Sequence, residues 1–284
     1  EGDKPDFILF NEFPLTGYST AGREDKLRYT IEIPGPETAA IGELAKACDS
    51  YIIFGSYARD DRDWPGHILS INTVVGRDGT IAGTFWKTRN VKRLSDDGEI
   101  PTTTIESVRD RYRALYGIDA EFPVLRTEYG NIAVSTVQLD PFVFAAFAMR
   151  GTEILFRTAT LFARDDVIAS ARFHNVYSAM SNITFPEGSG YERYGGGSLI
   201  VSPGGEVLAE EASNDEAIIS AEIPIAAFRD GRRIPRYPLA VVAPVYEQYV
   251  DEIPLNHMDR PREELPADRP AMKELLDRVS RWLP

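Results

Sequence analysis

The sequence predicts an α/β fold in which helices cover packed β-strands. Short apolar segments of strand length alternate along the chain with segments whose apolar residues recur at helical spacing. Turns rich in glycine, proline and aspartate separate these segments. Such alternation is typical of α/β domains, and 284 residues, 43% of them apolar, suffice for a sizeable core.

The first half opens with a short strand over Phe7 to Leu9, which is apolar throughout, as expected for a strand covered on both faces. A helix is predicted over Pro36 to Cys48, because proline suits a first turn and Ile41, Leu44 and Ala45 share one face. Strands are then predicted at residues 51–57, 69–75 and 81–86.

The alternation continues to about residue 221. Thr103 with Glu106 predicts a capping box for a helix that ends at Tyr116. The residues expected to face inward from this helix are Val108, Tyr112 and Leu115. Further strands are predicted at 122–125, 132–137, 154–156, 199–201, 206–208 and 218–221, with helices at 142–149 and 165–177.

The composition changes near residue 250. Four prolines interrupt a polar stretch, and residues 272–282 then carry apolar side chains at helical spacing. We therefore predict one domain over residues 1–250 and a C-terminal tail over residues 251–284 that contains a short amphipathic helix.

Charge and cysteine content exclude several classes of function. The net charge of −13, from 31 basic and 44 acidic residues, argues against binding to nucleic acid or to an anionic membrane surface. Cys48 is the only cysteine, so an intrachain disulfide and a multi-thiolate zinc site are excluded. No apolar run approaches the length of a membrane span, and the acidic start is unlike a signal peptide, which together predict a cytoplasmic protein.

Four segments carry polar residues at strand ends or turns. Residues 6–18 (DFILFNEFPLTGY) form an apolar strand that leads to Glu12, and residues 78–87 (DGTIAGTFWK) form a turn and a strand that ends at Lys87. Residues 130–142 read GNIAVSTVQLDPF, and residues 194–210 read YGGGSLIVSPGGEVLAE. In this order and spacing, the segments resemble the nitrilase superfamily, the carbon–nitrogen hydrolases, over about residues 5–250.

The resemblance implies a four-layer αββα sandwich of two sheets. It also implies a catalytic set in which a thiolate attacks the carbonyl or nitrile carbon, a glutamate acts as general base and a lysine steadies the developing charge. Glu12 matches the base and Lys87 matches the lysine. A second carboxylate is expected after the lysine, and the sequence does not choose among Asp96, Asp97 and Glu99. Because the family begins with a strand and helix ahead of the glutamate, we expect such a segment to precede the printed sequence.

The usual nucleophile is missing. Counted from Gly130, the cysteine position is occupied by Val137; counted back from Gly151, it falls on Ser135, because the segment is two residues shorter than the family pattern. Side chains alternate along a strand, so Thr136 faces away from Val137. The hydroxyl of Ser135 or of Thr136 could therefore replace the thiol only if the chain bends there.

The remaining polar candidates are weaker. Gln138 and Asp140 are placed to contact a ligand at the mouth of the site, whereas Cys48 is interpreted as a core residue and His174 as a structural histidine. The histidines are too scattered for a metal site, and no helix follows Gly195 to Gly197 to form a phosphate site, so neither a metal nor a cofactor is predicted.

Two functions remain open. One is a hydrolase that acts on a carbon–nitrogen bond of a small amide, nitrile or carbamoyl compound without a cysteine nucleophile; the other is a catalytically inactive binding or assembly protein. A homodimer or larger homo-oligomer is expected by resemblance, paired through helices at 143–149 and 165–177. The apolar residues expected to pair the two copies are Val143, Phe144, Phe147, Met149, Val167, Phe173 and Val176. The apolar stripe of Leu275, Val279 and Trp282 in the tail is expected to lie over the partner.

Overall fold

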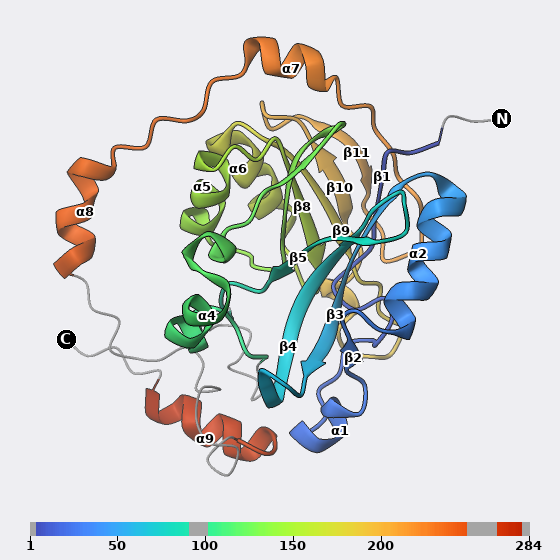
Figure 1. Cartoon of the computed structure of the whole chain (residues 1–284), viewed down its shortest axis with the longest axis vertical. Coiled ribbons are helices and arrows are strands. Elements are labelled where there is room, and N and C mark those ends of the chain that lie inside the picture. The colour runs from blue at the N-terminus through green and yellow to red at the C-terminus, as the bar shows by residue number, and fades with distance from the viewer. Residues whose placement is uncertain (1–3, 91–101, 249–265, 280–284) are drawn as a thin grey trace.

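The computed structural model describes residues 4–90, 102–248 and 266–279 (Figure 1). Its described strands form two stacked sheets. The first has the order β1-β3-β4-β5, with β2 paired to β3. β1 runs parallel to β3, whereas β4 is antiparallel to both β3 and β5. The bounds are β1 (Phe7–Leu9), β2 (Ile31–Glu32), β3 (Tyr51–Asp60), β4 (Trp64–Val75) and β5 (Ile81–Trp86).

The second sheet has the order β11-β10-β9-β8-β7-β6. Its central strands β7, β8 and β9 are parallel, and the outer pairs are antiparallel. The bounds are β6 (Leu125–Thr127), β7 (Gly130–Ser135), β8 (Ile154–Ala159), β9 (Tyr177–Asn182), β10 (Ser198–Val201) and β11 (Val207–Glu211).

Helices form the outer layers. α2 packs Ala45 against Ile52 and Phe54 of the first sheet, and α6 packs Val167 and Ala171 against the second. The helix bounds are α1 (Arg23–Leu27), α2 (Pro36–Cys48), α4 (Arg109–Tyr116), α5 (Pro141–Met149), α6 (Arg164–His174), α7 (Ile225–Gly231), α8 (Leu239–Gln248) and α9 (Arg269–Val279), and short 3₁₀ turns cover 106–108, 118–121 and 192–194. This arrangement confirms the predicted αββα sandwich.

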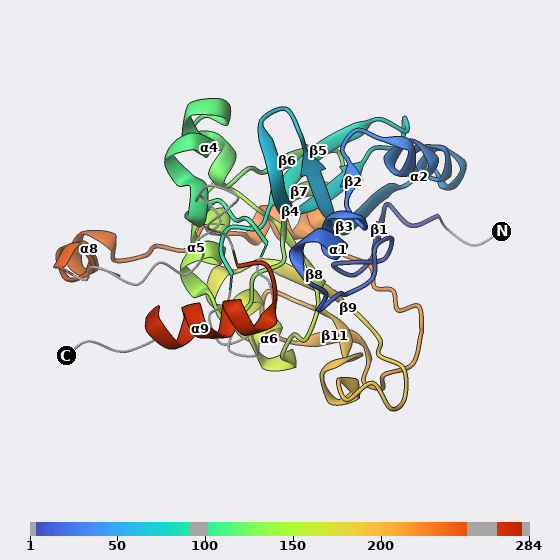
Figure 2. The same ribbon diagram turned by 90° about the horizontal axis from the view of Figure 1, so that it is seen from below.

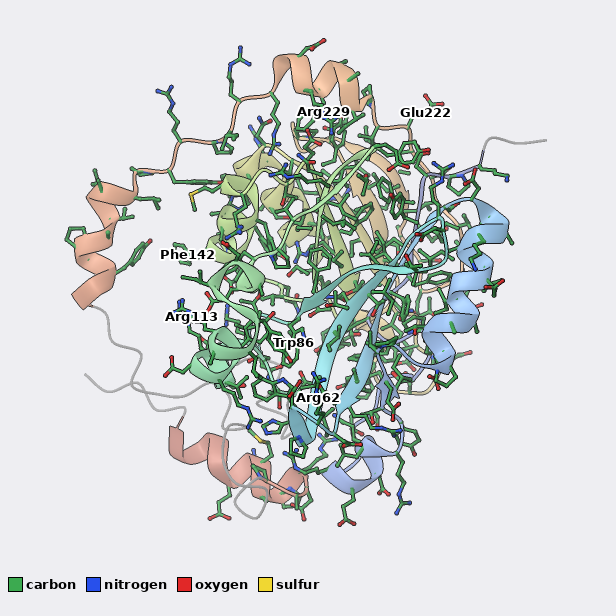
Figure 3. All side chains as sticks on the ribbon, viewed as in Figure 1. Arg62, Trp86, Arg113, Phe142, Glu222 and Arg229 are labelled. Carbon is green, nitrogen blue, oxygen red and sulfur yellow. The ribbon has the colours of Figure 1, made fainter. Side chains whose placement is uncertain are left out.

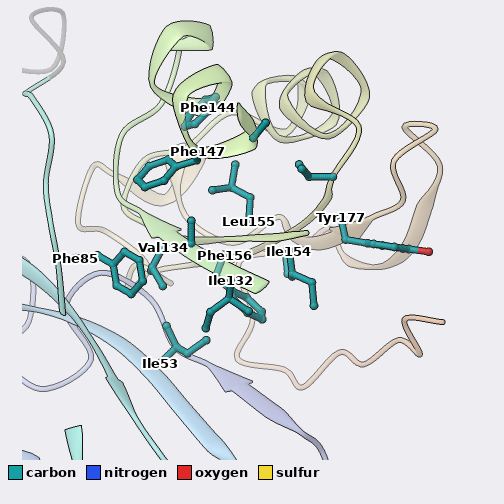
Figure 4. Close-up of a cluster of buried hydrophobic side chains, with 14 of the residues drawn as sticks. Ile53, Phe85, Ile132, Val134, Phe144, Phe147, Ile154, Leu155, Phe156 and Tyr177 are labelled. Carbon is teal, nitrogen blue, oxygen red and sulfur yellow. The ribbon is translucent and has the colours of Figure 1, made fainter. Parts of the chain in front are cut away.

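The largest core cluster joins the two sheets to α5. Ile53 and Phe85 of the first sheet meet Ile132 and Val134 of the second, and Phe144 covers the far side (Figure 4). Burial of these apolar side chains stabilises the sandwich by about 1.5–3 kcal/mol each. The same packing fixes how the strand ends of the two sheets face each other.

Several predicted boundaries were wrong. The strand predicted at 132–137 ends at Ser135, and the segment 218–221 forms no strand, since Ile218 is almost fully exposed and pairs with nothing described. The helix predicted after Thr103 starts as a 3₁₀ turn at Glu106. The side chains of Thr104 and Ser107 there accept hydrogen bonds from each other's backbone N–H groups, in place of the predicted pairing of Thr103 with Glu106. Leu115, expected to face inward, is 45% exposed. The sequence also did not predict β9 or the helices α1, α7 and α8.

The apolar content of α5 and α6 is mostly buried within this chain, which corrects the reasoning behind the predicted dimer. Five of the seven apolar side chains that were expected to need a partner are buried: Val143, Phe144, Phe147, Val167 and Val176. Met149 and Phe173 remain exposed, as does Phe142 on the outer edge of α5 (Figure 3). The homodimer therefore stays a prediction that depends on these three side chains.

The C-terminal segment has two parts. α7 and α8 arch around the sandwich (Figures 1 and 2), and the ring of Tyr246 of α8 lies 5.3 Å from that of Phe142 of α5. α9 instead returns to the domain, where Met272 packs against Phe13, Tyr57 and Ile68. None of the described helices is long and apolar enough to cross a membrane. Trp282 and the side chains of Leu275 and Val279 lie outside the described part of the chain.

Candidate active site

Glu12 and Lys87 meet where β1 and β5 end. Lys87 Nζ lies 3.2 Å from Glu12 Oε1, and Ser70 Oγ, on β4, donates a hydrogen bond of 3.5 Å to the same oxygen. The side chain of Glu12 is 4% exposed and that of Lys87 is 15% exposed. The expected juxtaposition of the two residues is confirmed.

Gly55 lets the chain bring Glu12 close to β3. The N–H of Gly55 donates to the carbonyl of Asn11 at 3.1 Å. A Cβ atom at position 55 would lie 2.4 Å from the carbonyl oxygen of Glu12, too close for any side chain. Lys87 is fixed on the other side, because its N–H donates to the carbonyl of Ser70 at 2.9 Å and so extends the β4–β5 ladder by one residue.

The pair keeps two opposite charges in a largely dehydrated place. A carboxylate and an ammonium at this distance attract strongly where water is scarce, which offsets the cost of removing each from water. Chemically, the carboxylate can accept a proton from a nucleophile, and the ammonium can stabilise negative charge on an oxygen.

The chain bends directly after β7. Ser135 Oγ accepts a hydrogen bond from the N–H of Val137 at 3.2 Å, and Leu139 adopts a left-handed φ of 55°. This local turn replaces ladder pairing, which explains why the strand stops at Ser135. The side chain of Val137 is fully buried, while its carbonyl accepts from the guanidinium of Arg157 at 2.6 Å. That Val137 occupies the nucleophile position stays a prediction.

Gln138 and Asp140 are engaged by the protein itself. Gln138 Nε2 donates to the carbonyl of Leu161 at 3.2 Å. Asp140 caps α5 by accepting from the N–H of Val143 at 3.3 Å, and it also pairs with the guanidinium of Arg89. These contacts give both side chains a structural role, and their contact with a ligand stays a prediction. The Arg89 pair ties the segment after Lys87 to the segment after β7.

Arg157, which the sequence analysis missed, anchors the same bend from the helix side. Its guanidinium is fully buried and donates to Asp166 at 2.7 Å and to Ser170 Oγ at 3.2 Å. Burial lowers the pKa of Arg157, and Asp166 opposes this by favouring the charged form. Asp166 also accepts from the N–H of Leu139 at 3.0 Å. An arginine inside an apolar strand is almost always paired, and that signal could have identified it.

His174 lies at the end of α6, and its Nδ1 is 2.6 Å from the hydroxyl of Tyr237. Burial, with a smaller contribution from Arg157, lowers the pKa of His174 to about 4. A neutral, buried and hydrogen-bonded imidazole agrees with the structural interpretation.

Cys48 and the acidic candidates do not join the site. Cys48 ends α2 beside the start of β3, whereas Glu12 contacts β3 at Gly55, about 13 Å along the strand from Tyr51. Asp96, Asp97 and Glu99 lie outside the described residues. Among the residues that are described, no group of three or more histidine, cysteine, aspartate or glutamate side chains could hold a metal ion.

A cavity of about 300 Å³ lies on the other face of the first sheet, between β3, β4, β5 and α4. Trp86 and Arg62 line it (Figure 3). Because successive strand residues face opposite ways, Trp86 points to this cavity while Lys87 points toward the second sheet. The charged pair, rather than this cavity, therefore marks the candidate site.

Comparison with known proteins agrees with this arrangement. A family model described as carbon–nitrogen hydrolase matches residues 3–233. The chain is 29% identical over 206 residues to omega-amidase NIT2 of Xenopus tropicalis, covering 69% of this chain and 70% of the relative. It is 28% identical over 214 residues to omega-amidase NIT2 of Homo sapiens, covering 72% of each.

Solved structures share the fold. The NitN amidase of Nesterenkonia sp. AN1 superposes with a TM-score of 0.57 at 15% identity, covering 86% of each chain. Nit3 of Saccharomyces cerevisiae, a member of branch 10 of the nitrilase superfamily, superposes with a TM-score of 0.57 at 16% identity, covering 74% of each. A further structure of the Nesterenkonia amidase shows acrylamide added at its active-site cysteine.

Proposed function

This chain belongs to the carbon–nitrogen hydrolase family, and on that premise we propose that it hydrolyses a carbon–nitrogen bond of a small compound with Glu12 as general base and Lys87 as charge stabiliser. The contact of 3.2 Å between the buried side chain of Glu12 and the partly buried side chain of Lys87 carries the proposal. Among amide, nitrile and carbamoyl substrates, the name of the relatives, omega-amidase, favours an amide.

The proposed reaction uses water in place of a thiolate. Glu12 removes a proton from the water, whose oxygen attacks the carbonyl carbon, and Lys87 stabilises the negative charge that develops on the carbonyl oxygen. Collapse of the tetrahedral intermediate breaks the carbon–nitrogen bond, and Glu12 returns the proton to the departing amine. The products are a carboxylic acid and ammonia or an amine.

A cysteine route is not proposed for this chain. The Nesterenkonia amidase has an active-site cysteine, whereas the only cysteine here, Cys48, belongs to α2 and is displaced along β3 from Glu12. Treatment with iodoacetamide is therefore expected to leave the turnover rate unchanged. Thiol-sensitive turnover would contradict the proposal.

The alternative is a catalytically inactive binding or assembly protein. The buried, apolar side chain of Val137 beside the bend after β7 favours it, because valine supplies no nucleophile. The two functions differ in whether ammonia is released from a bound amide.

The test measures ammonia release from a panel of primary amides that includes ω-amides of dicarboxylic acids, with nitriles and carbamoyl compounds alongside. Glu12→Gln should lower turnover at least about 100-fold, because general-base catalysis contributes that much or more. Lys87→Met should cost a similar factor by removing the ammonium.

Glu32→Gln is the matched control, because Glu32 also ends a strand and pairs with an arginine, Arg59, at 2.8 Å, but on the exposed surface. Its turnover should equal that of the unmodified protein. Full turnover by Glu12→Gln would exclude Glu12 as the base. Binding of an amide without any ammonia release would favour the inactive alternative.

A further inference from the structure

Two buried hydroxyl groups near the strand ends of the second sheet have no hydrogen-bond partner in the described part of the chain. They belong to Thr136, which is 2% exposed, and Thr160, which is 5% exposed. A buried hydroxyl without a partner costs free energy, so such groups are rare in folded proteins and are suited to receive a small polar molecule.

Thr136 and Thr160 each follow the last residue of a strand, Ser135 of β7 and Ala159 of β8, and strand alternation continued by one residue directs both hydroxyls toward the first sheet. Thr158 of β8 identifies that face, because its hydroxyl donates across the interface to Asn72 Oδ1 of β4 at 2.6 Å. The register of β7 and β8, continued one position past its last pair of Ser135 with Arg157, aligns Thr136 with Thr158. Thr160 is two residues beyond Thr158, so alternation returns it to the same face.

Successive contacts between the two sheets lead toward the same end of their interface in both sheets. The rings of Phe7 and Phe156 lie 5.3 Å apart, and the bond between Asn72 and Thr158 lies further along both sheets. In the registers of the first sheet, the step from Phe7 to Asn72 runs toward Glu12. In the second sheet, the corresponding step along β8 runs toward Thr160.

In this direction, the next residues of the first sheet at the interface are Ser70 and the charged pair of Glu12 and Lys87. Ser70 is two residues from Asn72 on the same face of β4, and its hydroxyl donates to Glu12 while its carbonyl accepts from the N–H of Lys87. The ion pair between Arg89 and Asp140 then closes the end of the interface. Continued by one residue, the alternation of β7 and β8 directs Thr136 and Thr160 toward the row of Glu12 and Lys87.

We propose that the hydroxyls of Thr136 and Thr160 hold the attacking water against Glu12. This inference rests on the proposed hydrolysis and names the groups that position its nucleophile. A buried water usually makes two to four hydrogen bonds, and two hydroxyls with one carboxylate oxygen supply three. Water bound in this way gives up a proton to Glu12 and presents its oxygen to a carbonyl carbon whose oxygen faces Lys87.

The position of Thr136 can be tested without any substrate. A Cys48→Ala background removes the native thiol, and Thr136→Cys or Ser135→Cys then introduces one thiol at a time. Ser135 is the matched control, because it is in register with Arg157, whose side chain turns to the helix side. Iodoacetamide, itself a small amide, is the probe, and the labelling rate is followed against pH by mass spectrometry.

Removing the charge of Glu12 should change the labelling rate of a thiol at position 136 but not that of a thiol at position 135. A neighbouring carboxylate raises a thiol pKa by about one unit or more within about 4–6 Å. Adding Glu12→Gln should therefore raise the labelling rate of the Thr136→Cys protein about tenfold at pH 7 and leave the Ser135→Cys protein unchanged. Equal sensitivity at both positions, or none at position 136, would overturn the placement of Thr136.

Turnover tests the role of the hydroxyls. With the amide that the unmodified protein hydrolyses, Thr136→Val and Thr160→Val should each lower kcat at least tenfold with little change in KM or in the thermal melt, and Thr136→Ser should restore most of the rate. Unchanged kcat in both valine variants would overturn the inference. If no amide is hydrolysed at all, the proposed function fails and the water-holding role with it, while the labelling result still decides whether Thr136 faces Glu12.

Discussion

Removal of Asp166 should destabilise the chain far more than removal of its neighbour Asp165. Asp166 pairs with Arg157, whose guanidinium is fully buried, and also accepts the N–H of Leu139. Deleting one partner of a buried ion pair typically costs about 3–5 kcal/mol, because the other charge stays buried without compensation.

The remaining contacts of Arg157 set the size of the effect. Its guanidinium keeps the carbonyl of Val137 and the hydroxyl of Ser170, and it lies 4.2 Å from the ring centre of Phe144 and 5.0 Å from that of Phe162. These contacts favour the lower end of the range. We expect Asp166→Ala to lose about 3 kcal/mol of the free energy of unfolding.

Asp165→Ala is the matched control. Asp165 lies in the same first turn of α6 and carries the same charge, but it is exposed. Its loss should cost only the helix-dipole contribution of about 0.3–1 kcal/mol. Urea unfolding at pH 7 measures both variants, provided that the slope against urea is unchanged.

The double variant Arg157→Met with Asp166→Ala should regain part of the stability that Asp166→Ala loses, since a methionine leaves no charge in the core. Equal losses for Asp165→Ala and Asp166→Ala, within about 0.5 kcal/mol, would refute the reasoning. That result would mean that Arg157 is not held by Asp166 in solution.

Three further predictions follow from single features. Gly55→Ala should abolish turnover, because its Cβ would meet the backbone of Glu12. Gly231→Ala, with open space around the added Cβ, should keep full turnover, and the rate of ammonia release is measured for both variants. The pKa of His174 is lowered to about 4, below the ordinary 6.5, so the unfolded chain binds the extra proton first; stability should fall as pH drops from about 6.5 toward 4, and His174→Gln should flatten that part of the urea-unfolding profile. Light scattering at micromolar concentration should show a homodimer that Phe173→Glu weakens, because Phe173 is 70% exposed, and a monomer for the unmodified protein would contradict this.

The sequence determined the alternation of strands and helices and the two residues at the centre of the candidate site. Strand-end positions for Glu12 and Lys87 follow from apolar runs that stop at a polar residue, and this local signal does not depend on distant contacts. The predicted α2 and β5 match the structure for the same reason.

Tertiary structure decided the features that depend on a neighbour. The segment 218–221 has strand composition but pairs with no strand of the described residues, whereas β9, with its small polar residues, becomes a strand because β8 and β10 flank it. The pairing of Arg157 with Asp166 likewise depends on packing between layers. Periodicity records which face of an element is apolar, but only the assembled sheets decide which polar groups meet across that face.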